Sequence, residues 1–276
     1  MTVRGVRVGA VEIGGGAPLA LLAGPCVIES RDSALRHAER LRALAAAAGL
    51  PLVYKSSFDK ANRTSLAGFR GVGIDEGLAI LGEVRRELGL PVVTDVHERE
   101  QIGAVAAVAD LLQTPAFLCR QTDFIQAVAK AGKPVNLKKG QFLSPWEMER
   151  VVEKARATGN AELLVTERGF MFGYNNLVAD FRSLPVLAAI GCPVVFDATH
   201  SVQRPGAQGT ESGGDRALVA PLARAAVAVG VDALFLEVHE APERALSDGA
   251  TSVALADLPG LLAQVVRLDR ARRESA

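Results

Sequence analysis

Short apolar runs recur eight times along the chain, and each ends in a cluster of charged or polar side chains. The runs are Leu21–Ala23, Leu52–Tyr54, Val92–Val93, Leu111–Leu112, Val135–Leu137, Leu163–Val165, Val194–Phe196 and Ala233–Leu236. Most of the segments between them are long enough for a helix. Buried strands that alternate with helices predict an α/β fold with a parallel sheet. Eight such units predict a closed (β/α)₈ TIM barrel, in which the carboxyl ends of the strands form the active-site face.

The helices between these strands have recognisable boundaries. The first is expected to begin at Ser30 or Asp32, either of which can cap it, and to end at Ala48 before Gly49. The others are expected over Asp75–Leu88, Glu98–Ala109, Asp123–Ala131, Ser144–Ala157, Asn176–Ala189, Asp215–Val229 and Asp257–Arg272. Pro185 should kink or split the helix in which it lies.

Residues 1–16 precede the first run and predict a short N-terminal β-ribbon, with alternating valine and isoleucine on both sides of a turn. Residues 17–276 are then expected to form a single barrel domain that carries the catalytic site. Two connections are unusually long, Ser56–Gly73 after the second strand and Ser201–Gly214 after the seventh. Long loops in compact domains are often functional, so we expect a binding loop or a lid at both places.

Composition narrows the class of protein. The 276 residues fit one barrel, for which about 250 is typical. The 31 basic and 31 acidic residues balance, so net charge does not indicate nucleic-acid or membrane binding. No apolar stretch approaches the ~20 residues of a membrane span. Three widely spaced cysteines argue against a disulfide scaffold and for a reducing, cytoplasmic setting.

The segment Ala17–Cys26 ends in LLAGPC and resembles a lipoprotein signal with its lipidated cysteine. Pro25 stands where a small residue should precede that cysteine, and a run of three glycines separates the segment from the basic start of the chain. We therefore favour a first barrel strand over a lipid anchor.

Cations gather on the predicted active-site face. They are Lys55, Lys60, Arg63, Arg120, Lys138, Lys139 and Arg168. Any one of them could be a solvated surface charge. Because like charges repel when they are brought together, the set indicates a ligand with several negative charges, such as a phosphate or a carboxylate.

Possible metal ligands also follow the strands. Cys26, His200, Glu237 and Asp248 come after the first, seventh and eighth strands, and closing a barrel brings the first strand beside the eighth. A thiolate, an imidazole and two carboxylates suit a divalent ion such as Fe²⁺, Zn²⁺, Mn²⁺ or Co²⁺. The spacing lacks the short repeat of a zinc finger, so a small buried thiol is the alternative interpretation of Cys26.

The remaining cysteines and the histidine of the first helix carry simpler interpretations. We assign Cys119 and Cys192 to packing, and we expect His37 to be solvated among the charges of its helix. A dinucleotide-binding glycine pattern is absent, because Gly71–Gly73 lacks the strand, turn and helix that this fingerprint requires.

The motifs at the strand ends span nearly the whole chain. They are AGPCVIES (Ala23–Ser30), KSSFDKANR (Lys55–Arg63), FRGVG (Phe69–Gly73), TDVHE (Thr94–Glu98), PAFLCRQTD (Pro115–Asp123), NLKKGQF (Asn136–Phe142), TERG (Thr166–Gly169), FGYNNLV (Phe172–Val178), FDATHSVQ (Phe196–Gln203) and ALSDG (Ala245–Gly249). Together they closely resemble the 3-deoxy-D-manno-octulosonate 8-phosphate synthases, and KSSFDKANR is the most specific of them. The sister enzymes that use erythrose 4-phosphate to make 3-deoxy-D-arabino-heptulosonate 7-phosphate look similar at GPC, KKG, ERG and SDG. They typically carry Lys-Pro-Arg-Thr-Ser where this chain has Lys55–Phe58.

The resemblance implies a transferase that condenses phosphoenolpyruvate with arabinose 5-phosphate, releases phosphate and feeds lipopolysaccharide biosynthesis. It also implies a cytoplasmic homotetramer whose site is completed across an interface. The alternatives are the heptulosonate synthase and a non-catalytic barrel that binds metal or phosphate without releasing phosphate.

The resemblance also implies roles for individual residues. Phosphoenolpyruvate would be held by Lys60, Arg120, Lys138 and Arg168, with Lys55 and Ser57 nearby. Arg63 and Thr64 would hold the sugar phosphate, and Thr64 adds a methyl group to the usual serine.

The catalytic groups would be Lys60, Asp95 and His200, with Lys60 stabilising an alkoxide and the other two handling protons. Metal-dependent members of the family carry a cysteine in the first-strand motif and metal-independent members an asparagine. Cys26 makes the chain resemble the metal-dependent class, and this resemblance implies His200, Glu237 and Asp248 as the other ligands.

Overall fold

The computed structural model describes residues 3–63, 65–206 and 212–275. Within them, eight parallel strands form a closed barrel. They are β3 (Ala20–Gly24), β4 (Leu52–Lys55), β5 (Val92–Asp95), β6 (Leu111–Thr114), β7 (Val135–Lys138), β8 (Leu163–Glu167), β11 (Val194–Asp197) and β14 (Ala233–His239). Each pairs with its neighbour along the chain, and β14 pairs with both β11 and β3. The predicted (β/α)₈ TIM barrel is confirmed.

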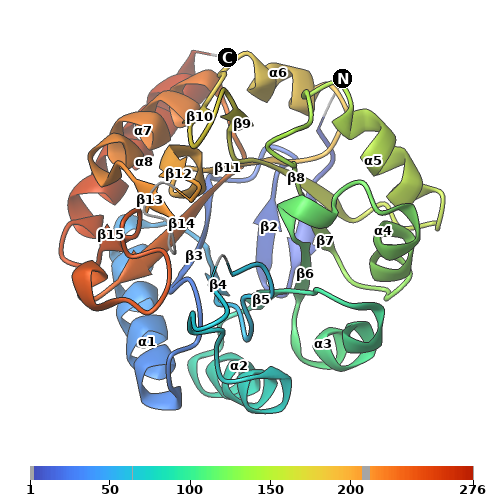
Figure 1. Ribbon diagram of the computed structural model, residues 1–276. Coiled ribbons are helices and arrows are strands. Elements are labelled where there is room, and N and C mark those ends of the chain that lie inside the picture. The colour runs from blue at the N-terminus through green and yellow to red at the C-terminus, as the bar shows by residue number, and fades with distance from the viewer. Residues whose placement is uncertain (1–2, 64, 207–211, 276) are drawn as a thin grey trace.

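The helices form an outer ring around the strands (Figure 1). They are α1 (Arg31–Ala48), α2 (Ile74–Leu88), α3 (Ile102–Val108), α4 (Thr122–Ala129), α5 (Met148–Arg156), α6 (Ser183–Ala188), α7 (Val219–Val229) and α8 (Leu258–Glu274). The boundaries of α1 follow its caps: the Ser30 side chain accepts a hydrogen bond from the amide of Ser33, and Gly49 takes the left-handed conformation.

One predicted helix, Asn176–Ala189, is wrong over its first half. The chain there forms the short strand β10 (Leu177–Val178), which pairs with β9 (Phe170–Met171), and α6 begins only at Ser183. Pro185 thus lies in the first turn of the helix, where its missing amide costs no hydrogen bond. The proline marks where a helix can begin and does not kink a longer one.

The core has two parts. Apolar side chains on the outer side of the strands pack against the helices. Those inside the barrel form a second cluster with both strands of an N-terminal ribbon, β1 (Val6–Val8) and β2 (Val11–Ile13), which pair antiparallel. The ribbon therefore shares the core of the barrel strands, and the division of the chain at residues 16 and 17 stays a prediction.

Several loops carry short strands of their own. In the connection after β11, β12 (Gln203–Arg204) pairs with β13 (Gly213–Gly214), and after β14 the strand β15 (Val253–Ala254) pairs with β14. Residues 207–211 of the predicted lid lie outside the described residues. Among the described helices, none combines the length and apolar character that a membrane crossing requires.

Candidate active site

A cleft opens at the carboxyl ends of the barrel strands, and it has two lobes. The inner lobe, about 250 Å³, is lined by Lys55, Asp95 and Lys138, and the outer lobe, about 610 Å³, by Arg63 and Asp248. The lobes share the residues Lys60, Asn62, Phe117, Arg168 and His200. Most of the residues that the sequence selects thus line one continuous cavity.

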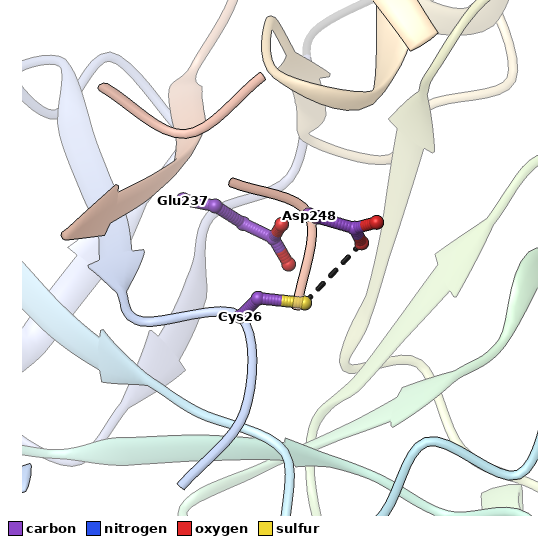
Figure 2. Close-up of side chains that lie close together, drawn as sticks. All are labelled: Cys26, Glu237 and Asp248. Carbon is purple, nitrogen blue, oxygen red and sulfur yellow. Dashed lines mark hydrogen bonds between the residues drawn. The ribbon is translucent and has the colours of Figure 1, made fainter. Parts of the chain in front are cut away.

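Three possible metal ligands converge beside this cleft. Cys26 follows β3, Glu237 lies in β14, and Asp248 lies in the loop after β14; their ligand atoms are all within 4.8 Å of one another. Figure 2 shows the three side chains pointing toward a common point. The register of the two strands, which pairs Gly24 with Glu237, brings Cys26 and Glu237 together. Asp248 has a positive φ of 49°, a left-handed conformation that is uncommon outside glycine and that Asp adopts more readily than most residues.

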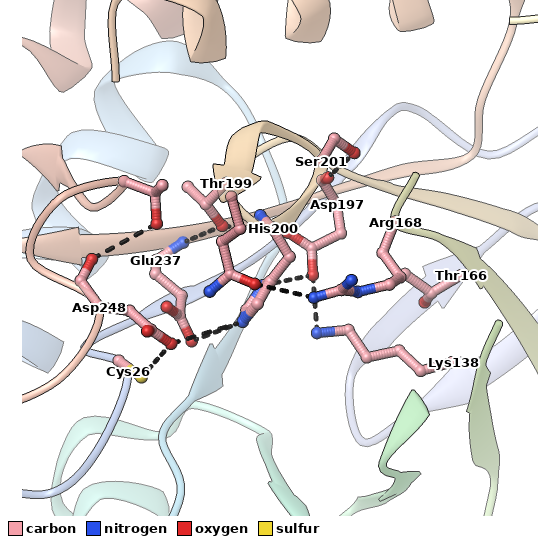
Figure 3. A network of polar contacts seen from close by, with 12 residues as sticks. Cys26, Lys138, Thr166, Arg168, Asp197, Thr199, His200, Ser201, Glu237 and Asp248 are labelled. Atoms are coloured by element: carbon pink, nitrogen blue, oxygen red, sulfur yellow. Dashed lines mark hydrogen bonds and ion pairs between the residues drawn. The ribbon is translucent and has the colours of Figure 1, made fainter. Parts of the chain in front are cut away.

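His200, the fourth predicted ligand, lies next to this group. Its Nε2 atom lies 3.5 Å from Oε1 of Glu237 and 3.8 Å from Oδ2 of Asp248. On the other side of the ring, Nδ1 lies 2.7 Å from Oδ2 of Asp197, as Figure 3 shows. A carboxylate behind a histidine fixes the ring orientation and the nitrogen that faces a metal. The predicted ligands are therefore brought together with an additional orienting group.

The electrostatics of this group fit a cation. Burial raises the pKa of the Cys26 thiol well above its ordinary value, and the carboxylates of Asp248 and Glu237 raise it further. The Oε2 atom of Glu237 is buried and has no hydrogen-bond partner among the described residues. A soft sulfur, an imidazole nitrogen and two carboxylates form a donor set that suits a borderline divalent ion.

Three lysines that line the cleft pair with buried carboxylates beside it. Nζ of Lys55 lies 3.1 Å from Oε1 of Glu237 and that of Lys60 3.7 Å, while Nζ of Lys138 lies 2.6 Å from Oδ2 of Asp197. Burial opposes the ionised form of Glu237, but His200, Lys55 and Lys60 outweigh it and hold the pKa of Glu237 well below its usual range. The Glu237 carboxylate therefore stays charged at neutral pH, and its ion pairs with Lys55 and Lys60 persist.

Arg168 reaches the same cleft from the end of β8. Its Nη2 atom donates to Oε1 of Gln203 at 2.9 Å. Nη1 is buried and has no hydrogen-bond partner among the residues that the structure describes. A buried guanidinium with a free donor is suited to an anionic ligand.

Asp95 is held from two sides. Ser57 donates to its Oδ2 atom, and Gln113 donates to Oδ1 at 2.5 Å. Gln113 in turn accepts from Asn136, and Asn136 accepts from Thr166, so the chain of hydrogen bonds crosses β5 to β8. Burial opposes the charge of Asp95, but Lys55 and Lys60 hold the pKa of Asp95 far below its usual value.

Other predicted residues lie elsewhere. Arg63 lines the outer lobe, and its Nε atom donates to the carbonyl of Phe69 at 2.9 Å. Arg120 is exposed and lines a depression that shares His97, Glu98 and Leu118 with the inner lobe, and its part in substrate binding stays a prediction. Thr64 lies outside the described residues.

Three buried polar residues near the site, Asp197, Gln113 and Asn136, were not among the predicted site residues. All three are fully or almost fully buried on barrel strands. The signal was present, because a polar residue inside an otherwise apolar strand must find a partner. In a barrel such a residue can face the lumen, where it meets the ligands from neighbouring strands.

Comparison with known proteins adds an independent finding. The model of the DAHP synthetase I family matches residues 4–274. A 2-dehydro-3-deoxyphosphooctonate aldolase from Magnetococcus marinus is 60% identical over 275 residues, which cover 100% of this chain and 96% of that protein. Proteins with the same name from Acidithiobacillus ferrooxidans and Trichlorobacter lovleyi are 61% and 58% identical over 264 residues. Those matches cover 96% of this chain and 94% and 97% of the relatives.

Proposed function

The chain belongs to the DAHP synthetase I family, and we propose that it condenses phosphoenolpyruvate with D-arabinose 5-phosphate and water. The products are 3-deoxy-D-manno-octulosonate 8-phosphate and inorganic phosphate. The curated relatives carry the other name of this synthase, so the resemblance seen in the motifs is confirmed. The heptulosonate synthase that uses erythrose 4-phosphate is not favoured.

One observation carries the proposal: four cations from three different strand ends, those of β4, β7 and β8, lie in the cleft beside the Cys26 group. Lys55, Lys60, Lys138 and Arg168 all line the inner lobe. The two substrates together bring about five negative charges, and a cluster of like charges gains most from such a ligand. A barrel that only held phosphate would not need the thiol and carboxylates beside it.

The reaction forms one carbon–carbon bond and one carbon–oxygen bond, and it breaks one carbon–oxygen bond. Carbon 3 of phosphoenolpyruvate attacks the sugar aldehyde, water adds at carbon 2, and one proton of the water neutralises the former aldehyde oxygen. The intermediate at carbon 2 then expels phosphate by cleavage of the bond between carbon 2 and the phosphate oxygen, and the remaining proton of the water leaves with the phosphate. Lys60 lines both lobes, so its ammonium group can stabilise the oxygen that becomes negative at the aldehyde.

The other proposed catalytic groups act by charge and position. A carboxylate with a strongly lowered pKa is a poor proton acceptor, so Asp95 serves as a fixed negative charge that orients Ser57, Lys55 and Lys60. His200 presents Nε2 to Glu237 and Asp248, and we assign this nitrogen to metal binding in preference to proton transfer.

Cys26, His200, Glu237 and Asp248 would hold a divalent ion such as Fe²⁺, Zn²⁺, Mn²⁺ or Co²⁺. When bound, such an ion supplies Lewis acidity to an oxygen of the reactants. Arg168 would fix the orientation of phosphoenolpyruvate, and Arg63 would hold the sugar phosphate in the outer lobe. We further propose a cytoplasmic homotetramer that supplies lipopolysaccharide biosynthesis.

The test is phosphate release from phosphoenolpyruvate in the presence of arabinose 5-phosphate, with erythrose 4-phosphate as the matched alternative. The assay is repeated after chelation and after Mn²⁺, Fe²⁺ or Zn²⁺ is restored. We expect release with the five-carbon sugar only, lost with chelator and recovered with metal. Release with erythrose 4-phosphate alone would reject the proposed substrate, and activity in chelator would reject the metal requirement.

A further inference from the structure

Two adjacent lysines at the end of β7 point in different directions. The ammonium group of Lys138 lies inside the barrel, 4.0 Å from the centre of the Phe235 ring and 2.6 Å from Asp197. That of Lys139 lies 3.6 Å from the centre of the Phe170 ring. Lys139 is 0% exposed, and it lines neither lobe of the cleft in the described part of the chain. It is therefore a charged residue next to the site that cannot touch a substrate there.

The surroundings of Lys139 account for its burial. Nζ donates to the carbonyl oxygens of Gly140, Leu143 and Gly169 at 3.2, 3.3 and 3.2 Å. The three donors of an ammonium group are thus all used. Oε1 of Glu167 lies 3.4 Å away and supplies the opposite charge. One side chain therefore joins the loop that follows β7 to the loop that follows β8.

Glu167, the partner of Lys139, also binds the backbone of Arg168. Its Oε1 atom accepts hydrogen bonds from the backbone amides of Arg168 at 2.9 Å and Gly169 at 2.7 Å. Gly169 has a φ of 92°, which turns the chain sharply out of the strand. The carboxylate therefore fixes the turn from which the Arg168 side chain enters the cleft, where its Nη1 atom is buried without a partner among the described residues.

We propose that Lys139 and Glu167 are positioning residues for the anion-binding guanidinium of Arg168. They touch no substrate, and they set the backbone turn that aims this arginine at phosphoenolpyruvate. The inference rests on the proposed function, because it names phosphoenolpyruvate as the ligand of Arg168. It predicts that replacing Lys139 weakens phosphoenolpyruvate binding only when the Arg168 side chain is present.

The test is a double-mutant cycle on the purified full-length protein. Lys139→Met removes the ammonium group and keeps the stem, and Arg168→Ala removes the guanidinium. The dissociation constant for phosphoenolpyruvate is measured by calorimetry, and KM for both substrates and kcat by phosphate release. We expect Lys139→Met to weaken phosphoenolpyruvate binding at least tenfold, to leave KM for arabinose 5-phosphate within twofold, and to have little further effect in Arg168→Ala. The inference would be overturned if Lys139→Met weakened phosphoenolpyruvate binding by the same factor in the wild type and in Arg168→Ala. It would also be overturned if Lys139→Met raised KM for arabinose 5-phosphate as much as KM for phosphoenolpyruvate.

Two controls separate positioning from general destabilisation. Val152→Ala removes packing from a buried position on α5, outside both loops, and it should leave both KM values unchanged. If Lys139→Met does not fold, the positioning role is tested instead by comparing phosphoenolpyruvate binding by Glu167→Gln and Glu167→Leu. The glutamine keeps an oxygen that can accept from the amides of Arg168 and Gly169, so it should bind phosphoenolpyruvate better than the leucine by at least threefold. Equal binding by the two variants would contradict the inference.

The wild-type protein distinguishes the two levels of failure. If it neither binds phosphoenolpyruvate nor releases phosphate, the proposed function fails and this inference falls with it. If the wild type is active but the cycle is additive, the synthase assignment stands and the positioning role of Lys139 is rejected.

Discussion

The sulfur atom of Cys26 lies 3.2 Å from Oδ2 of Asp248, although 222 positions separate the two residues along the chain. Closure of the barrel, which pairs β3 with β14, produces this contact. The hydroxyl of Ser247 also lies 2.7 Å from the sulfur. A buried thiol among carboxylates has its pKa raised, so its ionised form needs a cation beside it.

Replacement of Cys26 is the most direct test of this group. Cys26→Ala should abolish binding of a divalent metal, measured as metal content after dialysis, and should abolish phosphate release. Cys26→Asn should keep part of the turnover in chelator, because asparagine stands at this position in the metal-independent class. Cys119→Ala and Cys192→Ala, which also remove buried thiols, are the matched controls and should retain metal. Normal activity of Cys26→Ala in chelator would reject the metal site.

Asp197 tests whether the histidine needs its orienting carboxylate. Asp197→Asn keeps the shape but removes the charge that faces both His200 and Lys138. We expect metal affinity to fall about 10- to 100-fold, as for other carboxylates behind metal-binding histidines. We also expect the variant to lose about 3–5 kcal/mol of stability, because Lys138 is left buried without its partner.

Asp110→Asn is the matched control for this change. Asp110 is also a buried carboxylate, and it accepts from the amide of Val92 and pairs with Arg85 at the amino end of the barrel. Its loss should lower stability without changing metal affinity, which a competition titration against a chelator measures. Equal metal affinities for Asp197→Asn and the wild type would show that His200 needs no orienting group.

The lowered pKa of Asp95 leads to a prediction of how the free energy of unfolding depends on pH. Its folded-state pKa is lowered, chiefly by Lys55 and Lys60 against the opposing effect of burial. Its contribution is therefore complete above the unfolded-state pKa of about 4 and is lost as the pH falls toward the lower folded-state value. Below about pH 4, the unfolding free energy of the wild type should fall more steeply than that of Asp95→Asn, by about 1.4 kcal/mol per pH unit. Urea unfolding in chelator between pH 3 and pH 7 measures both slopes, and parallel slopes would contradict the assignment.

Much of the architecture was predictable because it depends on local patterns. Parallel strands buried on both faces read as apolar runs, and the cap at Ser30 and the stop at Gly49 set the bounds of α1. The gathering of Cys26, His200, Glu237 and Asp248 followed from barrel closure, since strand ends share one face. Because strand ends share one face, the position of the cation cluster at that face was also predictable.

Side-chain direction beyond the strands was not predictable. Lys138 and Lys139 were assigned to one cluster, yet only Lys138 lines the cleft, because the chain leaves the strand between them. His37 was expected to be solvated, and this was wrong: it is 1% exposed, and its ring lies 5.0 Å from that of His239. Charged neighbours along a helix do not reveal a buried position on its other face. Arg120 follows a strand but is exposed in the depression that adjoins the inner lobe, and it lines neither lobe itself.

The hydrogen bonds that run from Thr166 to Asp95 can be tested with a matched pair of variants, because β5 and β8 each carry a buried threonine. Thr166 donates to Oδ1 of Asn136 at 2.6 Å, whereas the Thr94 hydroxyl has no partner among the described residues. Valine has nearly the same shape as threonine and lacks the hydroxyl. Thr166→Val leaves a buried amide oxygen unpaired and should cost about 1–3 kcal/mol of stability. Thr94→Val removes an unpaired buried group and should be neutral or stabilising.

The two valine variants also separate stability from catalysis. Without Thr166, Asn136 and Gln113 lose the hydrogen bond that fixes their orientation toward Asp95, so kcat should fall in Thr166→Val and stay unchanged in Thr94→Val. Urea unfolding and phosphate-release kinetics on the same preparations measure both quantities. If Thr166→Val lost stability but kept wild-type kcat, the chain would only support the barrel. If both variants behaved alike, the hydrogen bonds from Thr166 to Asp95 would not act as a unit.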